Sequence, residues 1–130
     1  MKFSTTTRYG LRAIVYIAHQ GEICSAREIS EAENISLPYL EKIILKLSKA
    51  GLIEVKRGVT GGYFLALPAN KITVDDVVSV LEKTTSPAPC VNSDYCCPRH
   101  KNCPTRNIWE KIDKSIHSTL QTITLKDLIK

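Results

Sequence analysis

Apolar residues change their spacing after Gly51, and this change limits the fold more narrowly than any other feature of the chain. Before Gly51 they recur at helical intervals, and within residues 37–50 they are Leu40, Ile43, Ile44 and Leu47. After it they alternate with other residues over two short stretches that contain Ile53 and Val55, then Tyr63, Leu65 and Leu67. Glycines between positions 58 and 62 provide a turn. This pattern predicts a helix followed by a β-hairpin.

Another short helix precedes this one. Ser25 and Glu28 have the spacing of a capping box and start a helix that runs to about Glu33. A turn follows, and Ser36 then caps the longer helix, with Pro38 tolerated in its first turn. Two short helices with a tight turn and a following hairpin, or wing, form the winged helix-turn-helix plan, whose second helix lies in the major groove of DNA. The predicted fold is therefore mainly α with a small β-hairpin.

Basic residues gather in the same region. The chain has a net charge of +5 and a pI near 9.0, and residues 42–57 carry five basic residues against one acid, Glu54. Such a stripe suits phosphate contacts, although a solvated helix face has the same composition. Candidate DNA contacts are Pro38, Tyr39, Glu41, Lys42, Lys46, Lys49, Arg57, Thr60, Gly61 and Gly62. The first four are expected to face base edges and phosphates.

Further helices flank this predicted head. Residues 4–20 are apolar on nearly every side of a helix, so we expect that helix to lie between the head and a dimer partner. Thr73 and two aspartates open another helix, and Pro104 and Thr105 begin a last one of roughly 17 residues, about 25 Å long. Its apolar stripe is Ile108, Trp109, Ile112, Ile116 and Leu120. We interpret the stripe as a dimer interface, the alternative being a helix folded back on its own core.

Four of the five cysteines fall within residues 90–103, which read CVNSDYCCPRHKNC. Thiols this close together indicate a metal or iron–sulfur site, a disulfide staple or a redox pair. A staple is expected in secreted chains, whereas residues 1–10 lack the apolar run of about 7–15 residues found in signal peptides. No run approaches the roughly 18 apolar residues of a membrane span. We therefore expect a soluble, cytoplasmic protein without membrane contact, whose cysteine loop binds metal.

These patterns divide the chain into three parts. Residues 1–83 are predicted to form a winged helix-turn-helix DNA-binding domain, residues 84–104 a cysteine-rich cluster-binding loop, and residues 105–130 a dimerisation helix with a C-terminal turn. Cys24 lies outside the loop and is interpreted as a small packing residue. His19 and His117 have no ligand-spaced partner in the sequence, so we expect them to be structural or exposed.

Several segments resemble one family of regulators. YLEKI, KAGLIE, KRGVTGGY and WEKI stand in the order and spacing of the winged-helix transcription regulators IscR, NsrR, RirA and CymR, and the resemblance covers essentially the whole chain. It implies a homodimer on double-stranded DNA with a pseudo-palindromic operator. It also implies that Glu41 and Arg57 match positions used on DNA. Pro38 stands where IscR has a serine that touches bases, so the preferred DNA sequence is expected to differ.

The resemblance further implies an iron–sulfur cluster, with [2Fe–2S] favoured over [4Fe–4S]. Its ligands would be Cys90, Cys97 and Cys103, because five residues separate the last two, as in the family. The fourth ligand stays open. This chain has Arg106, which cannot ligate, where IscR has a histidine, and Arg8 where some relatives offer a carboxylate from the partner subunit. The remaining candidates for the fourth ligand are Cys96, His100 and a small exogenous ligand.

Two functions follow from these observations. The favoured one is a homodimeric transcription regulator, a repressor or an activator, that senses redox, iron or cluster status through a cluster in residues 90–103. The alternative is a cofactor-free winged-helix repressor like CymR, controlled by a protein or metabolite, with the cysteines acting as a thiol switch or zinc site. An enzyme is disfavoured because no nucleophile, base and orienting residue occur together in a recognisable motif, so no catalytic residue is predicted.

Overall fold

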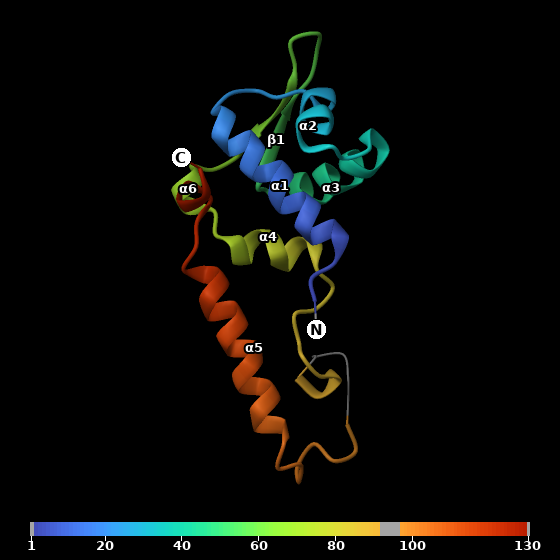
Figure 1. Cartoon of the computed structure of the whole chain (residues 1–130), viewed down its shortest axis with the longest axis vertical. Coiled ribbons are helices and arrows are strands. Elements are labelled where there is room, and N and C mark those ends of the chain that lie inside the picture. The colour runs from blue at the N-terminus through green and yellow to red at the C-terminus, as the bar shows by residue number, and fades with distance from the viewer. Residues whose placement is uncertain (1, 92–96, 130) are drawn as a thin grey trace.

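A computed structural model describes residues 2–91 and 97–129, and within them the chain forms helices and one hairpin in the order that the sequence predicts (Figure 1). The elements are α1 (Thr5–Gln20), α2 (Ala26–Glu33), α3 (Leu37–Lys49), β1 (Ile53–Lys56), β2 (Gly62–Leu65), α4 (Val74–Leu81), α5 (Arg106–Gln121) and α6 (Leu125–Leu128), with short 3-10 turns at Ala69–Lys71 and Pro89–Val91. The predicted mainly α fold with a winged helix-turn-helix head is thus confirmed. None of the helices in the described ranges is long and apolar enough to cross a lipid bilayer.

The core of the head forms where α1, α3 and α4 meet. Leu40, Ile43, Ile44 and Leu47 of α3 are buried, as their helical spacing predicts. They pack with Ile14 and Ile17 of α1 and with Val77 and Leu81 of α4 in one cluster. Gly10 is buried at the centre of this junction, where an added Cβ would collide with the Leu81 Cδ1 atom and lie 3.2 Å from Ile43 Cγ2. A side chain at position 10 would therefore require Leu81 or the neighbouring helices to shift.

The caps of α2 and α3 differ in detail from those that the sequence predicts. The Ser25 hydroxyl accepts a hydrogen bond from the Glu28 N–H at 3.0 Å, but the Glu28 carboxylate accepts one from the Tyr16 hydroxyl at 2.9 Å instead of closing the capping box. Ser36 occupies the N-cap position of α3 without a side-chain cap hydrogen bond to any described residue. Pro38 in the first turn explains part of this, because proline has no N–H to offer. Thr73 and Asp76, by contrast, form a complete capping box on α4.

The wing is an antiparallel hairpin in which Ile53 pairs with Leu65 and Lys56 with Gly62. Its turn requires glycine, since Gly58 has φ 113° and a Cβ on Gly61 would collide with the Lys56 carbonyl oxygen. Only the base of the hairpin reaches the core, so Ile53 is buried while Val55 is 48% exposed. Cys24 extends the base of the sheet by exchanging backbone hydrogen bonds with Tyr63, at 2.9 and 2.7 Å.

Helix α5 runs away from the head, and the cysteine loop lies at its far end (Figure 1). Along α5, which the structure describes throughout, every residue keeps part of its surface exposed. His117 ties the helix to α4, since its Nδ1 atom lies 2.8 Å from the Asp75 carboxylate, to which Gln121 also donates at 3.3 Å. The expectation that His117 is structural therefore agrees with its contacts. Residues 122–129 then return to the head, where Leu125 is fully buried.

Candidate functional site

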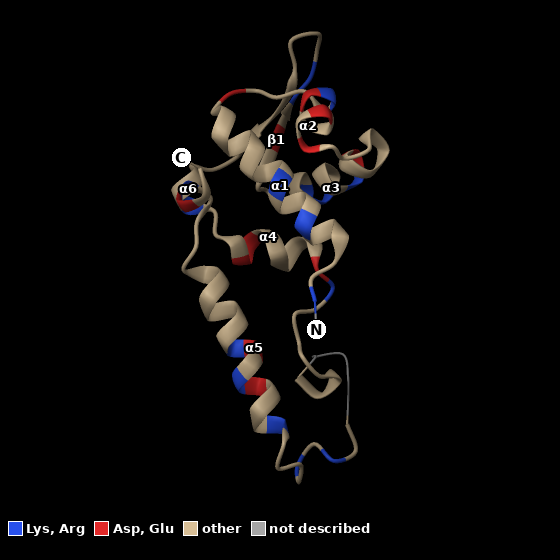
Figure 2. Ribbon diagram, in the orientation of Figure 1, with Lys and Arg blue, Asp and Glu red and all other residues tan. Residues whose placement is uncertain are grey.

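The basic residues of α3 lie on its solvent side. Lys42, Lys46 and Lys49 follow one another at intervals of four and three residues, which places them on one face, and all three are exposed. They border a shallow depression of about 330 Å³ that Thr6 and Tyr39 also line. Figure 2 shows these basic positions on α3 and those at the start of the wing, on the head and away from the cysteine loop. This face of α3 has the charge and shape to meet a phosphate backbone.

The outer face of α3 also carries groups that can touch base edges. Glu41 and Pro38 are exposed near the start of the helix. Leu45, one turn further on, is 55% exposed although it is apolar. The sequence interpretation missed Leu45, yet a signal was present, because position 45 falls outside the buried set at 40, 43, 44 and 47. An apolar side chain in the major groove suits contact with a thymine methyl group.

Tyr39 is held against α1 rather than projecting freely. Its ring meets the Tyr9 ring edge-on, with centroids 5.9 Å apart at an interplanar angle of 88°. Its hydroxyl lies 2.6 Å from the Thr6 hydroxyl. Tyr39 is half-buried as a result, so among the predicted DNA contacts it is the one that also anchors α3 to the head.

The wing tip presents small and basic groups to solvent. Arg57, Val59 and Thr60 are exposed, Val59 completely, while Gly61 and Gly62 are partly covered. Gly62 cannot be replaced without cost, because its Cβ would collide with the backbone of Cys24. The predicted wing contacts thus divide into exposed side chains at the tip and backbone positions at the base of the turn.

The cysteine loop places its thiols on three different local structures. Cys90 lies in the 3-10 turn Pro89–Val91, Cys97 precedes a turn closed by the hydrogen bond from His100 N–H to the Cys97 carbonyl at 3.0 Å, and Cys103 lies just before α5. Cys96, the extra thiol of the prediction, is outside the described residues. Among the residues described, no group of three or more histidine, cysteine or acidic side chains is close enough to hold a metal ion. The structure therefore does not gather the predicted ligands.

The chemistry of these residues nevertheless fits an iron–sulfur cluster. Cys90, Cys97 and Cys103 are free thiols, and each is partly exposed. A hydrogen bond from the Thr105 hydroxyl, 3.2 Å from the sulfur, lowers the pKa of Cys103, and the Thr105 and Arg106 N–H groups at the start of α5 and the charge of Arg99 act in the same direction. The thiolate is the form that binds metal, so this environment favours a ligand at position 103.

His100 lies beside the residue that occupies the family's histidine position. Its Nε2 atom accepts a hydrogen bond from Nη1 of Arg106 at 2.7 Å. Arg106 in turn lies 3.2 Å from the Glu110 carboxylate, one turn along α5. A guanidinium is always protonated, so the Arg106 contact occupies the lone pair with which His100 would bind a metal through Nε2. To serve as the fourth ligand through that nitrogen, His100 must leave Arg106.

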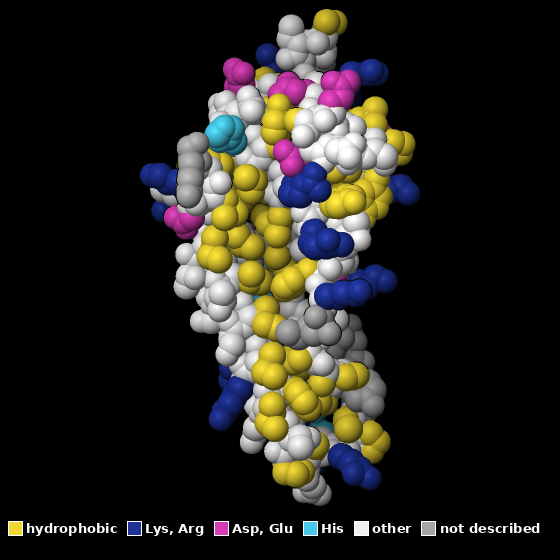
Figure 3. Space-filling view, in the orientation of Figure 1, with side chains coloured by type: hydrophobic (Ala, Val, Ile, Leu, Met, Phe, Trp, Pro, Cys, Tyr) yellow, Lys and Arg dark blue, Asp and Glu magenta, His cyan; other side chains and the backbone are white. Residues whose placement is uncertain are grey.

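An apolar surface extends from the head onto α5. Ile108 is 50% exposed, and Trp109, Ile112, Ile116 and Leu120 are half-buried. The last three line a groove of about 450 Å³ together with Phe3. Figure 3 shows apolar side chains in a band that continues from the head down this helix. Exposed apolar residues on a monomer are usually scattered singly, whereas here they form a continuous band.

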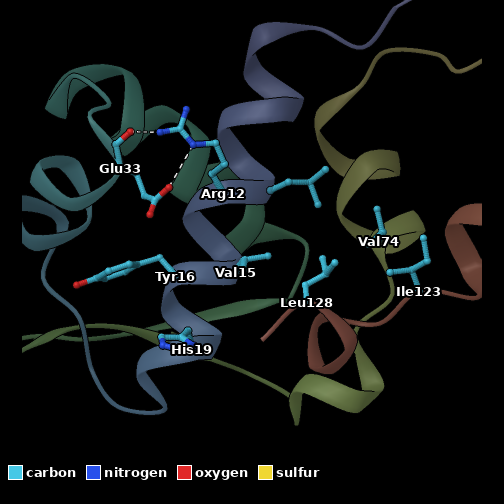
Figure 4. Close-up of a pocket in the computed structure, with 9 residues that line it drawn as sticks. Arg12, Val15, Tyr16, His19, Glu33, Val74, Ile123 and Leu128 are labelled. Carbon is cyan, nitrogen blue, oxygen red and sulfur yellow. Dashed lines mark hydrogen bonds and ion pairs between the residues drawn. The ribbon is translucent and has the colours of Figure 1, made fainter. Parts of the chain in front are cut away.

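A larger pocket of about 770 Å³ opens on the same side of the head (Figure 4). Val15 of α1 lies on one side of it, and Val74, Ile123 and Leu128 lie on the other. Leu11 also lines the pocket. The ion pair between Arg12 and Glu33, at 3.2 Å, lies at its rim, as does the exposed His19. The pocket residues that belong to α1 lie on the outward face of this helix, which the sequence predicts to meet a partner.

Comparison with known proteins agrees with this architecture. The sequence profile of the Rrf2 family, described as an iron-dependent transcriptional regulator, matches residues 3–130. Protein rrf2 of Nitratidesulfovibrio vulgaris (strain Hildenborough) is 42% identical over 132 residues, an alignment that covers 100% of this chain and 88% of that protein.

Two solved structures are similar throughout. IscR of T. potens aligns with a TM-score of 0.79 at 35% identity, covering 98% of this chain and 85% of its own. CymR (YrzC), the global cysteine regulator of B. subtilis, also aligns with a TM-score of 0.79 at 35% identity, covering 98% of this chain and 95% of its own. Both alignments therefore extend well beyond the head.

Proposed function

The chain belongs to the Rrf2 family of transcriptional regulators, and from this premise we propose how it reads DNA and what it senses. It is a DNA-binding regulator and not an enzyme, as the sequence predicted. The observation that carries the proposal is the exposed face of α3, where Lys42, Lys46 and Lys49 are all solvent-exposed beside Glu41.

In the proposed mode, α3 enters the major groove. Glu41 faces base edges, where a carboxylate accepts a hydrogen bond from cytosine, while Lys46 and Lys49 contact phosphates along the backbone. Pro38 and Lys42 flank Glu41 at the start of the helix, and Tyr39 holds that start against α1. Arg57, Thr60 and the backbone of Gly61 and Gly62 contact the neighbouring groove or its sugar–phosphate.

We propose that the working form is a homodimer on a pseudo-palindromic operator. Every residue of α5 is partly exposed, and its apolar stripe adjoins the band on the head, so a second copy would cover both. The stripe residues are Ile108, Trp109, Ile112, Ile116 and Leu120. A two-fold pair of heads places the two recognition helices on half-sites separated by one helical turn or a multiple of it.

The proposed sensor is the loop 90–103, with Cys90, Cys97 and Cys103 holding an iron–sulfur cluster, [2Fe–2S] in preference to [4Fe–4S]. Such a cluster supplies a group that oxidation, nitrosylation or loss of iron can change. The free state of the three thiols and the lowered pKa of Cys103 support this assignment. The fourth ligand is Cys96 or His100, and in the latter case the bond between His100 and Arg106 must open.

The similarity to CymR supports an alternative for the loop. The chain is as similar to CymR as to IscR in both TM-score and identity. In this alternative the loop is a thiol switch or zinc site, and a protein partner or metabolite controls a repressor that needs no cluster.

The DNA assignment is tested by titrating an operator, selected from random duplexes, at several salt concentrations. Each phosphate contact adds about 0.9 to the slope of log affinity against log salt, so Lys46→Ala on both subunits should lower the slope by about 1.8. Glu41→Ala should change the preferred base at one position per half-site and leave the slope unchanged.

Lys126→Ala is the matched control, because Lys126 is also exposed but lies on α6. It should keep both slope and preference. If Lys46→Ala and Glu41→Ala behave like this control on the selected operator, α3 is not the recognition helix.

A further inference from the structure

The acidic side chain at the start of α1 comes from the end of another helix, α4. The first turn of α1 has no acidic residue of its own, whereas the backbone N–H groups at a helix start favour an anion. Glu82, at the C-terminal end of α4, meets this need: its Oε2 atom accepts hydrogen bonds from the Ser4 N–H at 2.9 Å and from the Thr7 hydroxyl at 2.7 Å. Thr7 is completely buried, so this contact fixes the start of α1 on the end of α4.

The same turn of α1 contacts the start of α3. Thr6 lies between the two residues that Glu82 binds, and its hydroxyl is 2.6 Å from that of Tyr39. Tyr39 belongs to the first turn of α3 and packs edge-on against Tyr9, one turn further along α1. A shift of the first turn of α1 therefore moves the residues that hold the start of α3.

Glu82 is also the residue from which the chain leaves α4 toward the cysteine loop. It is the last residue whose N–H bonds into α4, to the Val78 carbonyl at 2.8 Å, and residues 83–89 then lead to Cys90. This segment is attached to α5, because the Thr85 hydroxyl lies 2.8 Å from Nε2 of His117. A change at Cys90 would therefore have to pass along residues 83–89 and past the Thr85 contact to reach Glu82.

We propose that Glu82 is a positioning residue through which the cysteine loop acts on the recognition helix. The inference rests on the proposed DNA-binding role of α3. When the loop is displaced, the Glu82 carboxylate leaves Ser4 and Thr7, the first turn of α1 loses its charged partner, and the start of α3 shifts with Thr6 and Tyr39. Two-site couplings of this kind typically change affinity about 5–150-fold.

The test compares wild type with Glu82→Gln before and after the loop thiols are alkylated with N-ethylmaleimide. Cys24 is buried and is spared. Alkylation of wild type should change the affinity for the selected operator at least fivefold and raise hydrogen exchange in the first turns of α1 and α3. In Glu82→Gln, exchange there should already be raised, and alkylation should change the affinity less than twofold. Thr6→Val, which removes only the contact to Tyr39, should also reduce the response to alkylation.

Glu31→Gln is the control, since Glu31 is an exposed acid on α2, and it should respond to alkylation like wild type. An alkylated wild type with unchanged affinity, or an equal response in Glu82→Gln, overturns the role of Glu82 and leaves DNA binding intact. If Glu82→Gln does not fold, two other measurements test the role of Glu82. They are the response of Thr6→Val to alkylation and the hydrogen exchange of wild type before and after alkylation. If wild type selects no operator, the proposed DNA function fails, and the exchange pattern alone decides the role of Glu82.

Discussion

Replacing Gly10 by alanine tests the packing on which the head depends, because two opposing effects can be weighed. In a helix interior, alanine is more favourable than glycine by about 1 kcal/mol. At Gly10, however, the new methyl group would collide with Leu81 Cδ1 on α4 and lie 3.2 Å from Ile43 Cγ2 on α3. Leu81 and Ile43 are 5% and 1% exposed, so neither side chain can turn into solvent.

Overpacking of a core typically costs about 1–3 kcal/mol, and contacts with two buried side chains place this case in the upper half of that range. After subtraction of the helical preference, Gly10→Ala should destabilise the head by about 1–2 kcal/mol. For a chain of this size that lowers the melting temperature by roughly 4–8 °C. Calorimetry or circular dichroism measures the change at one fixed protein concentration, because the melting temperature of the proposed homodimer would depend on concentration.

Leu81→Ala provides the matched background. It removes the group that the methyl would strike, so adding Gly10→Ala to it should be neutral or stabilising by up to about 1 kcal/mol. The sign of the substitution should thus reverse between the two backgrounds. If Gly10→Ala raises the melting temperature of the otherwise unchanged protein, the close approach of α1 to α4 is wrong.

Three further outcomes follow from the contacts described above. Ile112→Asp should give a monomer in sedimentation, because an unpaired carboxylate in an apolar seam is costly, whereas Ser118→Asp on the exposed side of α5 should stay dimeric. After anaerobic reconstitution with iron and sulfide, Cys97→Ala should lose the visible absorbance that Cys24→Ala retains, and a colourless wild type would favour the thiol-switch or zinc alternative. Burial raises the pKa of Glu82, but the hydrogen bonds from Ser4 and Thr7 outweigh it and lower the net value. The stability advantage of wild type over Glu82→Gln should therefore be complete above the ordinary pKa of 4.5 and fade as the pH falls through the lowered value, whereas an advantage that grows on acidification would contradict the assignment.

The winged-helix head could be predicted from the sequence because its signals are local. The helical spacing of α3 and the capping box of Thr73 and Asp76 each lie within one element. α5 was expected to have roughly 17 residues and has 16. Where a second element competes, the local signal misleads: the Glu28 carboxylate bonds to Tyr16 on α1 instead of completing the box with Ser25.

The contacts that join elements could not be predicted in the same way. Glu82 and Ser4 are 78 residues apart, and nothing in the sequence around Glu82 indicates that it meets a helix start. The half-buried position of Tyr39 likewise depends on Thr6 and Tyr9 of a different helix. The exposed Leu45 could have been found from the sequence, because it lies off the buried stripe of α3. The choice of Cys97 over Cys96 as a ligand stays a prediction, since Cys96 lies outside the described residues.

The burial of Cys24 separates its reaction with thiol reagents from that of the cysteines in the loop. Its side chain is fully buried where the chain bridges to Tyr63, and burial raises its pKa to about 12, so almost none of it is thiolate at neutral pH. A thiol reagent added to the native protein consequently counts cysteines of the loop, and any occupant or oxidation of the loop lowers that count. The Cys24 thiol reacts only when the structure around it opens, since it is buried in the core of the head. One reaction trace with a chromogenic reagent would therefore report the state of the loop thiols in its fast phase and the opening of the structure around Cys24 in its slow phase.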